Sequence, residues 1–169
     1  LVELSRDVLA ASSVIDGASQ RVGQLEVALA SAHWAALVGA RPALLPGEEG
    51  ASEGLLLREA RHPLLIDQVH RGALDEVVPI DLRLGVDFDM LLITGPNTGG
   101  KTLALKTAGL FALMSRVGLP VPAEDGTTIP LYDGIAADIG DEQEIRQNLS
   151  TFASHLVRVS DALERATPD

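Results

Sequence analysis

A glycine-rich stretch at residues 91–107, LLITGPNTGGKTLALKT, most constrains what this chain can fold into. A short apolar run leads into glycines and then into helical spacing of apolar residues, which predicts a strand, a loop and a helix. We expect Leu92 and Ile93 to be buried and to fix the start of the loop. The loop satisfies the pattern G-x-x-x-x-G-K-[ST] through Gly95, Pro96, Asn97, Thr98, Gly99, Gly100, Lys101 and Thr102.

Such a loop suits phosphate groups. Glycines lack a Cβ, so successive backbone N–H groups can turn toward one anion, and the following helix adds the positive end of its dipole. Lys101 would reach the β- and γ-phosphates, and the Thr102 hydroxyl would bind the accompanying Mg²⁺. The sequence therefore predicts a nucleotide site with Mg²⁺, and the loop alone fits kinases, GTPases and ATPases.

The composition indicates one globular domain with an acidic surface. Of 169 residues, 46% are hydrophobic, and the net charge is −11. Seven acids and one base lie between residues 120 and 150, a surface that would repel DNA. There is no cysteine, and no apolar run approaches the ~18 residues of a membrane span. We expect a cytoplasmic protein without a membrane partner.

The chain divides into three expected regions. From Leu4 to Ala36, apolar residues recur at alternating steps of four and three, which predicts a long heptad-patterned helix over residues 1–40. This helix would dock on its own domain or lead toward another segment, with Trp34 as a core anchor. Residues 41–54 concentrate Pro, Gly and acids and predict a loop or linker. Residues 55–169 are expected to form an α/β domain.

Within this last region the patterns predict several elements. Strands are expected at residues 55–57, 77–84 and 88–94, the last two as an antiparallel pair. The helix after the loop should end at Gly118. Ser150 is expected to cap a final helix with one apolar stripe.

Two segments resemble a known family. GPNTGGKTLALKTAGLFALMSRVGLPVPAEDGT and DGIAADIGDEQEIRQNLSTFASHL resemble the ATPase domain of the MutS family, most of all its second bacterial branch, whose members carry a C-terminal Smr nuclease domain. The resemblance runs from about Arg58 to Asp169. It implies an α/β P-loop NTPase domain of the ABC/MutS type with a mixed sheet. It also implies a homodimer in which two subunits pack head to tail and complete each other's ATP sites.

The resemblance also implies a segment that acts on the partner's site. Asn148, Ser150 and Thr151 would belong to this signature segment, and Asn97 would face the γ-phosphate across the interface. A serine at a helix start offers a hydroxyl and free N–H groups to a phosphate, but it can equally be an ordinary cap that faces solvent.

Further residues are matched by the resemblance alone. Gln143 would sense the metal as the glutamine of an ABC Q-loop does, although a solvated acidic loop is the alternative. Val77, Val78 and His62 would lie on the adenine side of the nucleotide. His62 could instead be a turn histidine whose side chain is satisfied by the backbone.

One requirement of ATP hydrolysis is missing from the sequence. This class needs a strand that ends in an acid for Mg²⁺, followed by a glutamate for the attacking water. No apolar run leads into Asp-Glu after Thr107. By the resemblance that strand would begin beyond Asp169. We therefore expect part of a longer protein, truncated before the Walker B strand, that binds ATP and hydrolyses it poorly alone.

The resemblance implies that the longer protein is a DNA-binding ATPase and endonuclease. Its expected roles are suppression of homologous recombination, DNA repair and rescue of collided ribosomes. Two alternatives stay open from the residues themselves. One is a small-molecule kinase of the P-loop type, and the other is a non-catalytic dimerisation module built on the heptad helix.

Overall fold

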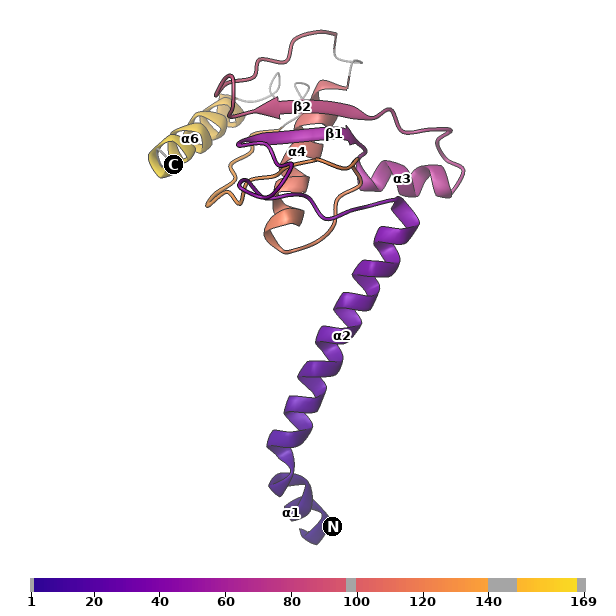
Figure 1. Cartoon of the computed structure of the whole chain (residues 1–169). Coiled ribbons are helices and arrows are strands. Elements are labelled where there is room, and N and C mark those ends of the chain that lie inside the picture. The colour runs from indigo at the N-terminus through magenta and orange to yellow at the C-terminus, as the bar shows by residue number, and fades with distance from the viewer. Residues whose placement is uncertain (1, 97–99, 140–148, 167–169) are drawn as a thin grey trace.

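The computed structural model shows a helical arm that projects from a small domain (Figure 1). It describes residues 2–96, 100–139 and 149–166, with residues 149–155 described through their backbone only. The elements in chain order are α1 (Val2–Ala10), α2 (Ser12–Val38), β1 (Leu55–Ala60), α3 (Pro63–His70), β2 (Ile80–Leu84), α4 (Lys101–Arg116) and α6 (Leu149–Arg165).

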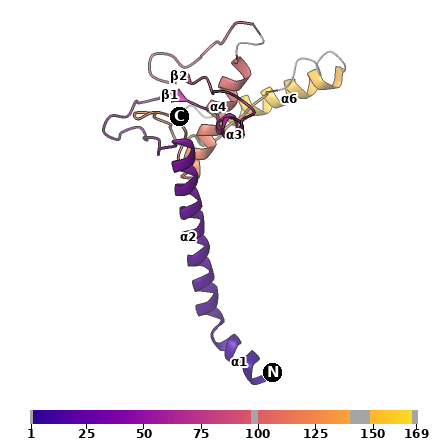
Figure 2. The same ribbon diagram turned by 90° about the vertical axis from the view of Figure 1, so that its right-hand side faces the viewer.

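The arm consists of α1 and α2 and points away from the domain, as the perpendicular view also shows (Figure 2). At a rise of about 1.5 Å per residue, the 27 residues of α2 span about 40 Å. The sequence predicts one continuous helix here, but a turn at Ala11 divides the arm into two helices. No side chain of either helix is buried, so the heptad stripe is exposed along the arm. α2 ends at Gly39, whose φ of +67° is left-handed.

The sheet of the described residues consists of two antiparallel strands, β1 and β2. Leu57 pairs with Leu82, and the register shifts between Leu57 and Ala60. At this bulge Glu59 has a left-handed φ of +49°, and its N–H donates to Asp81 Oδ1 at 2.9 Å. The mixed sheet expected from the resemblance is therefore not what these residues form. Among the described residues, the one parallel pairing is an isolated bridge outside both strands.

The strand predicted at residues 88–94 is wrong, and so is its predicted pairing with the strand before it. This segment has no regular structure, Leu92 is 83% exposed and Ile93 is only half-buried. An extended segment becomes a strand only when a neighbour supplies the ladder of backbone hydrogen bonds. Among the described residues, none pairs with residues 89–94, and β2 pairs with β1 instead.

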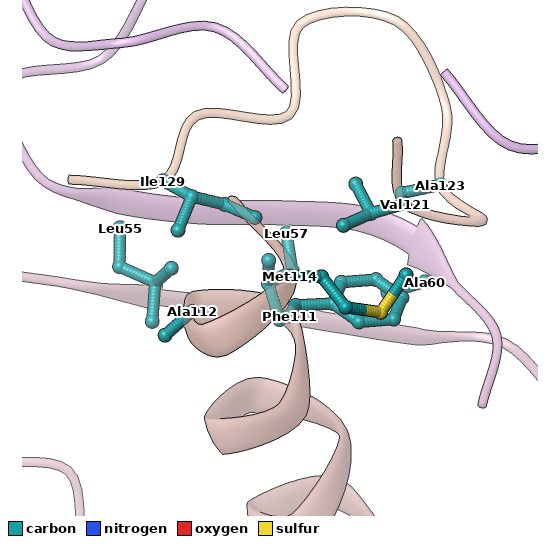
Figure 3. Close-up of a cluster of buried hydrophobic side chains, with 9 residues drawn as sticks. All are labelled: Leu55, Leu57, Ala60, Phe111, Ala112, Met114, Val121, Ala123 and Ile129. Atoms are coloured by element: carbon teal, nitrogen blue, oxygen red, sulfur yellow. The ribbon is translucent and has the colours of Figure 1, made fainter. Parts of the chain in front are cut away.

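Helix α4 packs on β1 to form the core, together with residues 121–129 (Figure 3). Phe111 of α4 and Leu57 of β1 are fully buried. Trp34 of the arm packs against this cluster, which confirms its predicted role as an anchor. The buried apolar members are Leu55, Leu57, Ala60, Phe111, Ala112, Met114, Val121, Ala123 and Ile129.

Residues 41–54 contain no helix or regular strand, but backbone hydrogen bonds join them to residues 121–129. The Arg41 N–H donates to the Val121 carbonyl oxygen at 2.9 Å, and the Val121 N–H donates to the Arg41 carbonyl oxygen at 2.8 Å. Arg41 also pairs with Asp125, and the hydrogen bond to that carboxylate raises the pKa of the guanidinium. The end of the arm is therefore fastened to the domain beyond α4.

Helix α6 lies at the edge of the domain (Figure 1). Its predicted apolar stripe is present where side chains are described, and Leu156, Val159 and Leu163 are all exposed. Arg158 Nε lies 3.5 Å from Asp138 Oδ1. In the part of the chain that the structure describes, no helix is both long and apolar enough to span a membrane.

Candidate functional site

Two glycines of the predicted phosphate loop have backbone conformations that favour glycine. Gly95 has a φ of +141°, and Gly100 has φ +75° and ψ 8° at the N-cap of α4. Both angles lie where side chains with a Cβ are strained. The two fixed glycines of the motif are therefore required by the shape of the backbone at either end of the loop. Asn97, Thr98 and Gly99 lie outside the described residues.

Lys101 connects the two ends of this loop. Its Nζ donates to the Gly95 carbonyl oxygen at 2.5 Å and to the Pro96 carbonyl oxygen at 2.7 Å. The side chain thus turns back from the first residue of α4 toward the residues where the loop begins. The structure brings together three residues that the motif predicts to act as one site.

The first turn of α4 can accept an anion. Gly100 provides no side-chain cap, and the first backbone bond into the helix runs from the Ala104 N–H to the Gly100 carbonyl oxygen at 2.9 Å. The N–H groups of the first helical turn come before that bond, so they are not part of the ladder of hydrogen bonds inside the helix. Together with the ammonium of Lys101, they form a concentration of positive charge at the helix start.

Thr102 is exposed in that same turn and offers a hydroxyl oxygen. Among the described residues, no three His, Asp or Glu side chains are arranged to hold a metal ion. A Mg²⁺ ion at this place could take the Thr102 hydroxyl together with oxygens of phosphate and water, which is a usual arrangement for this ion.

His62 stands at the N-cap of α3, directly after β1. Its Nδ1 is buried and has no hydrogen-bond partner among the described residues, so the backbone does not satisfy this nitrogen as one interpretation of the sequence expects. Burial lowers the pKa of the imidazole, and the charge of Lys106 on α4 lowers it further. His62 therefore lies close to the helix that carries the loop, in surroundings that disfavour its protonated form.

The other predicted site residues are less well placed by the structure. Val77 is half-buried and Val78 is 72% exposed, in an irregular segment between α3 and β2, and neither belongs to the core cluster. Gln143 and Asn148 lie outside the described residues. α6 begins at Leu149, so the backbones of Ser150 and Thr151 lie in its first turn. The prediction that Ser150 caps this helix is therefore wrong, because Ser150 lies inside the helix.

One residue with a positioning role was not predicted. Arg116, in the last turn of α4, donates through Nη1 to the carbonyl oxygens of Tyr132 at 3.3 Å and Asp133 at 2.8 Å. It ties the end of the helix to the segment that leads toward α6. The sequence offers only a weak signal for this, because a basic residue in a last helical turn is common for reasons of the helix dipole alone.

Comparison with known proteins supports the resemblance. The family model of MutS domain V matches residues 91–169. Endonuclease MutS2 of Pelotomaculum thermopropionicum is 46% identical over 169 residues, which is 100% of this chain and 20% of that relative. Endonuclease MutS2 of Exiguobacterium sibiricum is 56% identical over 105 residues, 62% of this chain and 12% of the relative. The protein of the same name from Synechocystis is 46% identical over 138 residues, 80% of this chain and 16% of the relative. The chain thus spans about a fifth or less of the length of these relatives.

Proposed function

The chain belongs to the MutS family, and on that premise we propose that it is a P-loop NTPase domain whose residues 95–102 bind the phosphates of ATP with Mg²⁺. One observation carries the proposal. The ammonium of Lys101 and the uncapped first turn of α4 face the same short loop, which begins and ends at glycines with positive φ. Backbone N–H groups and one mobile cation at a helix start are what a triphosphate requires.

Calorimetric titration with ATP and Mg²⁺ tests this proposal. Lys101→Ala removes the ammonium and should abolish the binding heat. Lys106→Ala removes the same charge from an exposed position on the same helix and should leave the affinity within about twofold, since long-range charge effects are screened. Equal affinities in the two variants would refute the assigned site.

We propose that Thr102 supplies the protein oxygen for Mg²⁺. In Thr102→Ala, addition of Mg²⁺ should no longer strengthen ATP binding, whereas binding of ATP without metal should persist. We further propose that these 169 residues bind ATP with little hydrolysis, since no apolar run leads into Asp-Glu after Thr107.

The adenine side and the partner side of the site remain proposals from the family. On the adenine side we propose Val77, Val78 and His62, of which His62, with its buried Nδ1 and lowered pKa, has the clearest structural support. For the partner's site we propose Ser150 and Thr151, in the first turn of α6, together with Asn148, and we propose Gln143 as the residue that senses the metal. The first-turn N–H groups of a 17-residue helix suit a γ-phosphate, as those of α4 do.

For a longer protein with this segment, we propose the function that the relatives' name indicates. Those relatives are called endonucleases, and a homodimeric, DNA-binding ATPase fits that name. Suppression of recombination, DNA repair and action on collided ribosomes are proposals for the whole protein. The segment between residues 120 and 150 is acidic and would repel the phosphates of DNA, so we propose that DNA binds to another part of the whole protein.

The exposed heptad stripe of the arm supports a second candidate function, dimerisation that does not depend on nucleotide. Sizing of the chain with and without ATP and Mg²⁺ separates the two. Dimers that form only with nucleotide favour the ATPase proposal, and dimers that form equally in both conditions favour association through the arm.

A further inference from the structure

The chain contains three Asp-Gly pairs, which begin at Asp16, Asp125 and Asp133. Because glycine has no Cβ, its backbone nitrogen is the least hindered one that can attack the carboxyl group of a preceding aspartate. The attack closes a ring only where the backbone can leave its resting angles and the carboxyl group is not held by a partner. The surroundings of each pair therefore decide which of the three can react.

The first two pairs are restrained. Asp16 lies inside α2, where helical backbone angles hold the chain in a ladder of hydrogen bonds and keep the ring from closing. The carboxylate of Asp125 is 81% exposed but pairs with the guanidinium of Arg41. It must leave this ion pair before it can turn toward the nitrogen of Gly126.

The third pair has no such restraint. Asp133 and Gly134 are both exposed, in the segment 130–139 that contains no helix or strand. Among the described residues, the Asp133 carboxylate has no ion pair or hydrogen bond, and the Gly134 N–H has no backbone partner. A Cβ at Gly134 would meet no atom within 4 Å, so the space beside its nitrogen is open. The carboxyl group and the nitrogen can therefore meet.

The main-chain carbonyl group of Asp133 is bound to a cation. Arg116 donates through Nη1 to this oxygen at 2.8 Å, and to the carbonyl oxygen of Tyr132 at 3.3 Å. A guanidinium bonded to a carbonyl oxygen stabilises the negative charge that develops on that oxygen when water attacks the carbon. Of the two carbonyl groups in a ring formed at Asp133, Arg116 thus activates the one from the main chain.

We propose that Asp133 is a site of spontaneous isoaspartate formation and that Arg116 directs its second step. First, the Gly134 nitrogen bonds to Cγ of Asp133 and loses its hydrogen, and the carboxyl group releases one oxygen as water, which closes a succinimide ring. Then water adds to the main-chain carbonyl carbon of Asp133, the bond from that carbon to the Gly134 nitrogen breaks, and the nitrogen regains a hydrogen. The main chain now runs through Cβ and Cγ. The α-carboxylate that is set free lies beside the Arg116 guanidinium and pairs with it.

Incubation of the whole chain at neutral pH in water enriched in oxygen-18 tests the site. Each ring opening leaves one heavy oxygen on the residue, and peptide mapping by mass spectrometry with electron-transfer fragmentation distinguishes isoaspartate from aspartate. Label should accumulate at Asp133 about fivefold faster than at Asp125, where an exposed ion pair has to break first. Equal rates at the two residues, or no label at Asp133, would overturn the proposal.

Arg41→Ala is the control for the role of pairing. It removes the ion pair of Asp125 but keeps the two backbone hydrogen bonds between residue 41 and Val121, and circular dichroism checks that the chain stays folded. Labelling of Asp125 should rise about fivefold, while that of Asp133 stays the same. Slow labelling of Asp125 in this folded variant would contradict the explanation that pairing selects the site.

The ratio of the two labelled products tests Arg116. Arg116→Gln removes the cation and should lower the ratio of labelled isoaspartate to labelled aspartate at residue 133 by about fivefold. In urea, where the contact is lost, the variant and the unmodified chain should give the same ratio. Equal ratios in the two folded chains would overturn the directing role of Arg116, whereas the rate of labelling at Asp133 tests the site by itself.

Discussion

The two glycines that flank α4 permit a sharp test of which end of the helix serves a ligand. Gly100 precedes the helix with a φ of +75°, and Gly118 follows it with a φ of +74°. A Cβ at either position would meet no atom within 4 Å. Alanine at either site is therefore penalised by the backbone angle alone, and the two substitutions form a matched pair.

The expected cost follows from that angle. A left-handed conformation costs an L-residue about 1–2 kcal/mol. The lower conformational entropy of the unfolded chain with alanine offsets about 0.4–1 kcal/mol of this cost, so each variant should lose about 1 kcal/mol of unfolding free energy. For a chain of this size that corresponds to a fall of about 3 °C in melting temperature. Urea unfolding measures the loss of unfolding free energy. Circular dichroism and the fluorescence of Trp34, which packs on the core, follow the transition.

Nucleotide binding should distinguish the two variants. If the loop in Gly100→Ala relaxes to relieve its strain, ATP must restore the original shape, and up to about 1.4 kcal/mol of strain then appears as a tenfold weaker affinity. Gly118→Ala should bind ATP as the unmodified chain does. Equal affinity in both variants, with equal losses of stability, would show that the start of α4 does not shape a phosphate site.

Three further substitutions test the core and His62, whose Nδ1 is buried. Thr128 is fully buried, and its Oγ1 accepts the Ser52 N–H at 2.9 Å. Thr128→Val should therefore cost about 1–3 kcal/mol in urea unfolding, whereas Thr107→Val, which removes only a bond to a carbonyl group of its own helix, should cost less than about 1 kcal/mol. Burial, and then the charge of Lys106, lowers the pKa of His62 below its ordinary value of 6.5. Between that lowered value and 6.5 the unfolded chain binds more protons, so unfolding free energy falls as the pH falls. His62→Asn should lose this part of the slope, which sets in as the pH falls through 6.5 toward the lowered pKa. An unchanged slope would contradict it.

Local signals in the sequence were sufficient where an element depends on its own residues. Helix α4 begins at Lys101 and ends before Gly118, as the motif and the C-terminal glycine predict. Trp34 packs on the core, as a lone tryptophan without basic or aromatic neighbours suggests. The period of the arm predicted helix, but Ala11 carries no sequence signal for the turn that divides it.

Signals that depend on distant partners were insufficient. The apolar run before the loop has the composition of a buried strand, yet Leu92 is exposed, because composition sets the tendency to extend and a neighbouring strand decides whether the ladder forms. Residues 41–54 have the composition of a free loop, but Arg41 bonds to Val121 across 80 positions of sequence. The contact of Lys101 with two carbonyl groups could likewise not be predicted from the motif, because a motif specifies side chains and not the main-chain oxygens that they contact.

Helix α4 explains why the loop can have a defined geometry even though the segment before it has no ladder. Its first residue sends an ammonium back to the start of the loop, its middle places Phe111 in the core, and its last turn holds residues 132–133 through Arg116. A helix fixed at its middle and end positions its first turn without help from the preceding strand. The carbonyl groups of Gly95 and Pro96 are therefore held from the helix side, through Lys101. It follows that the lysine shapes the very loop in which it is proposed to bind phosphate, so substitutions at this position alter both the shape of the site and its charge.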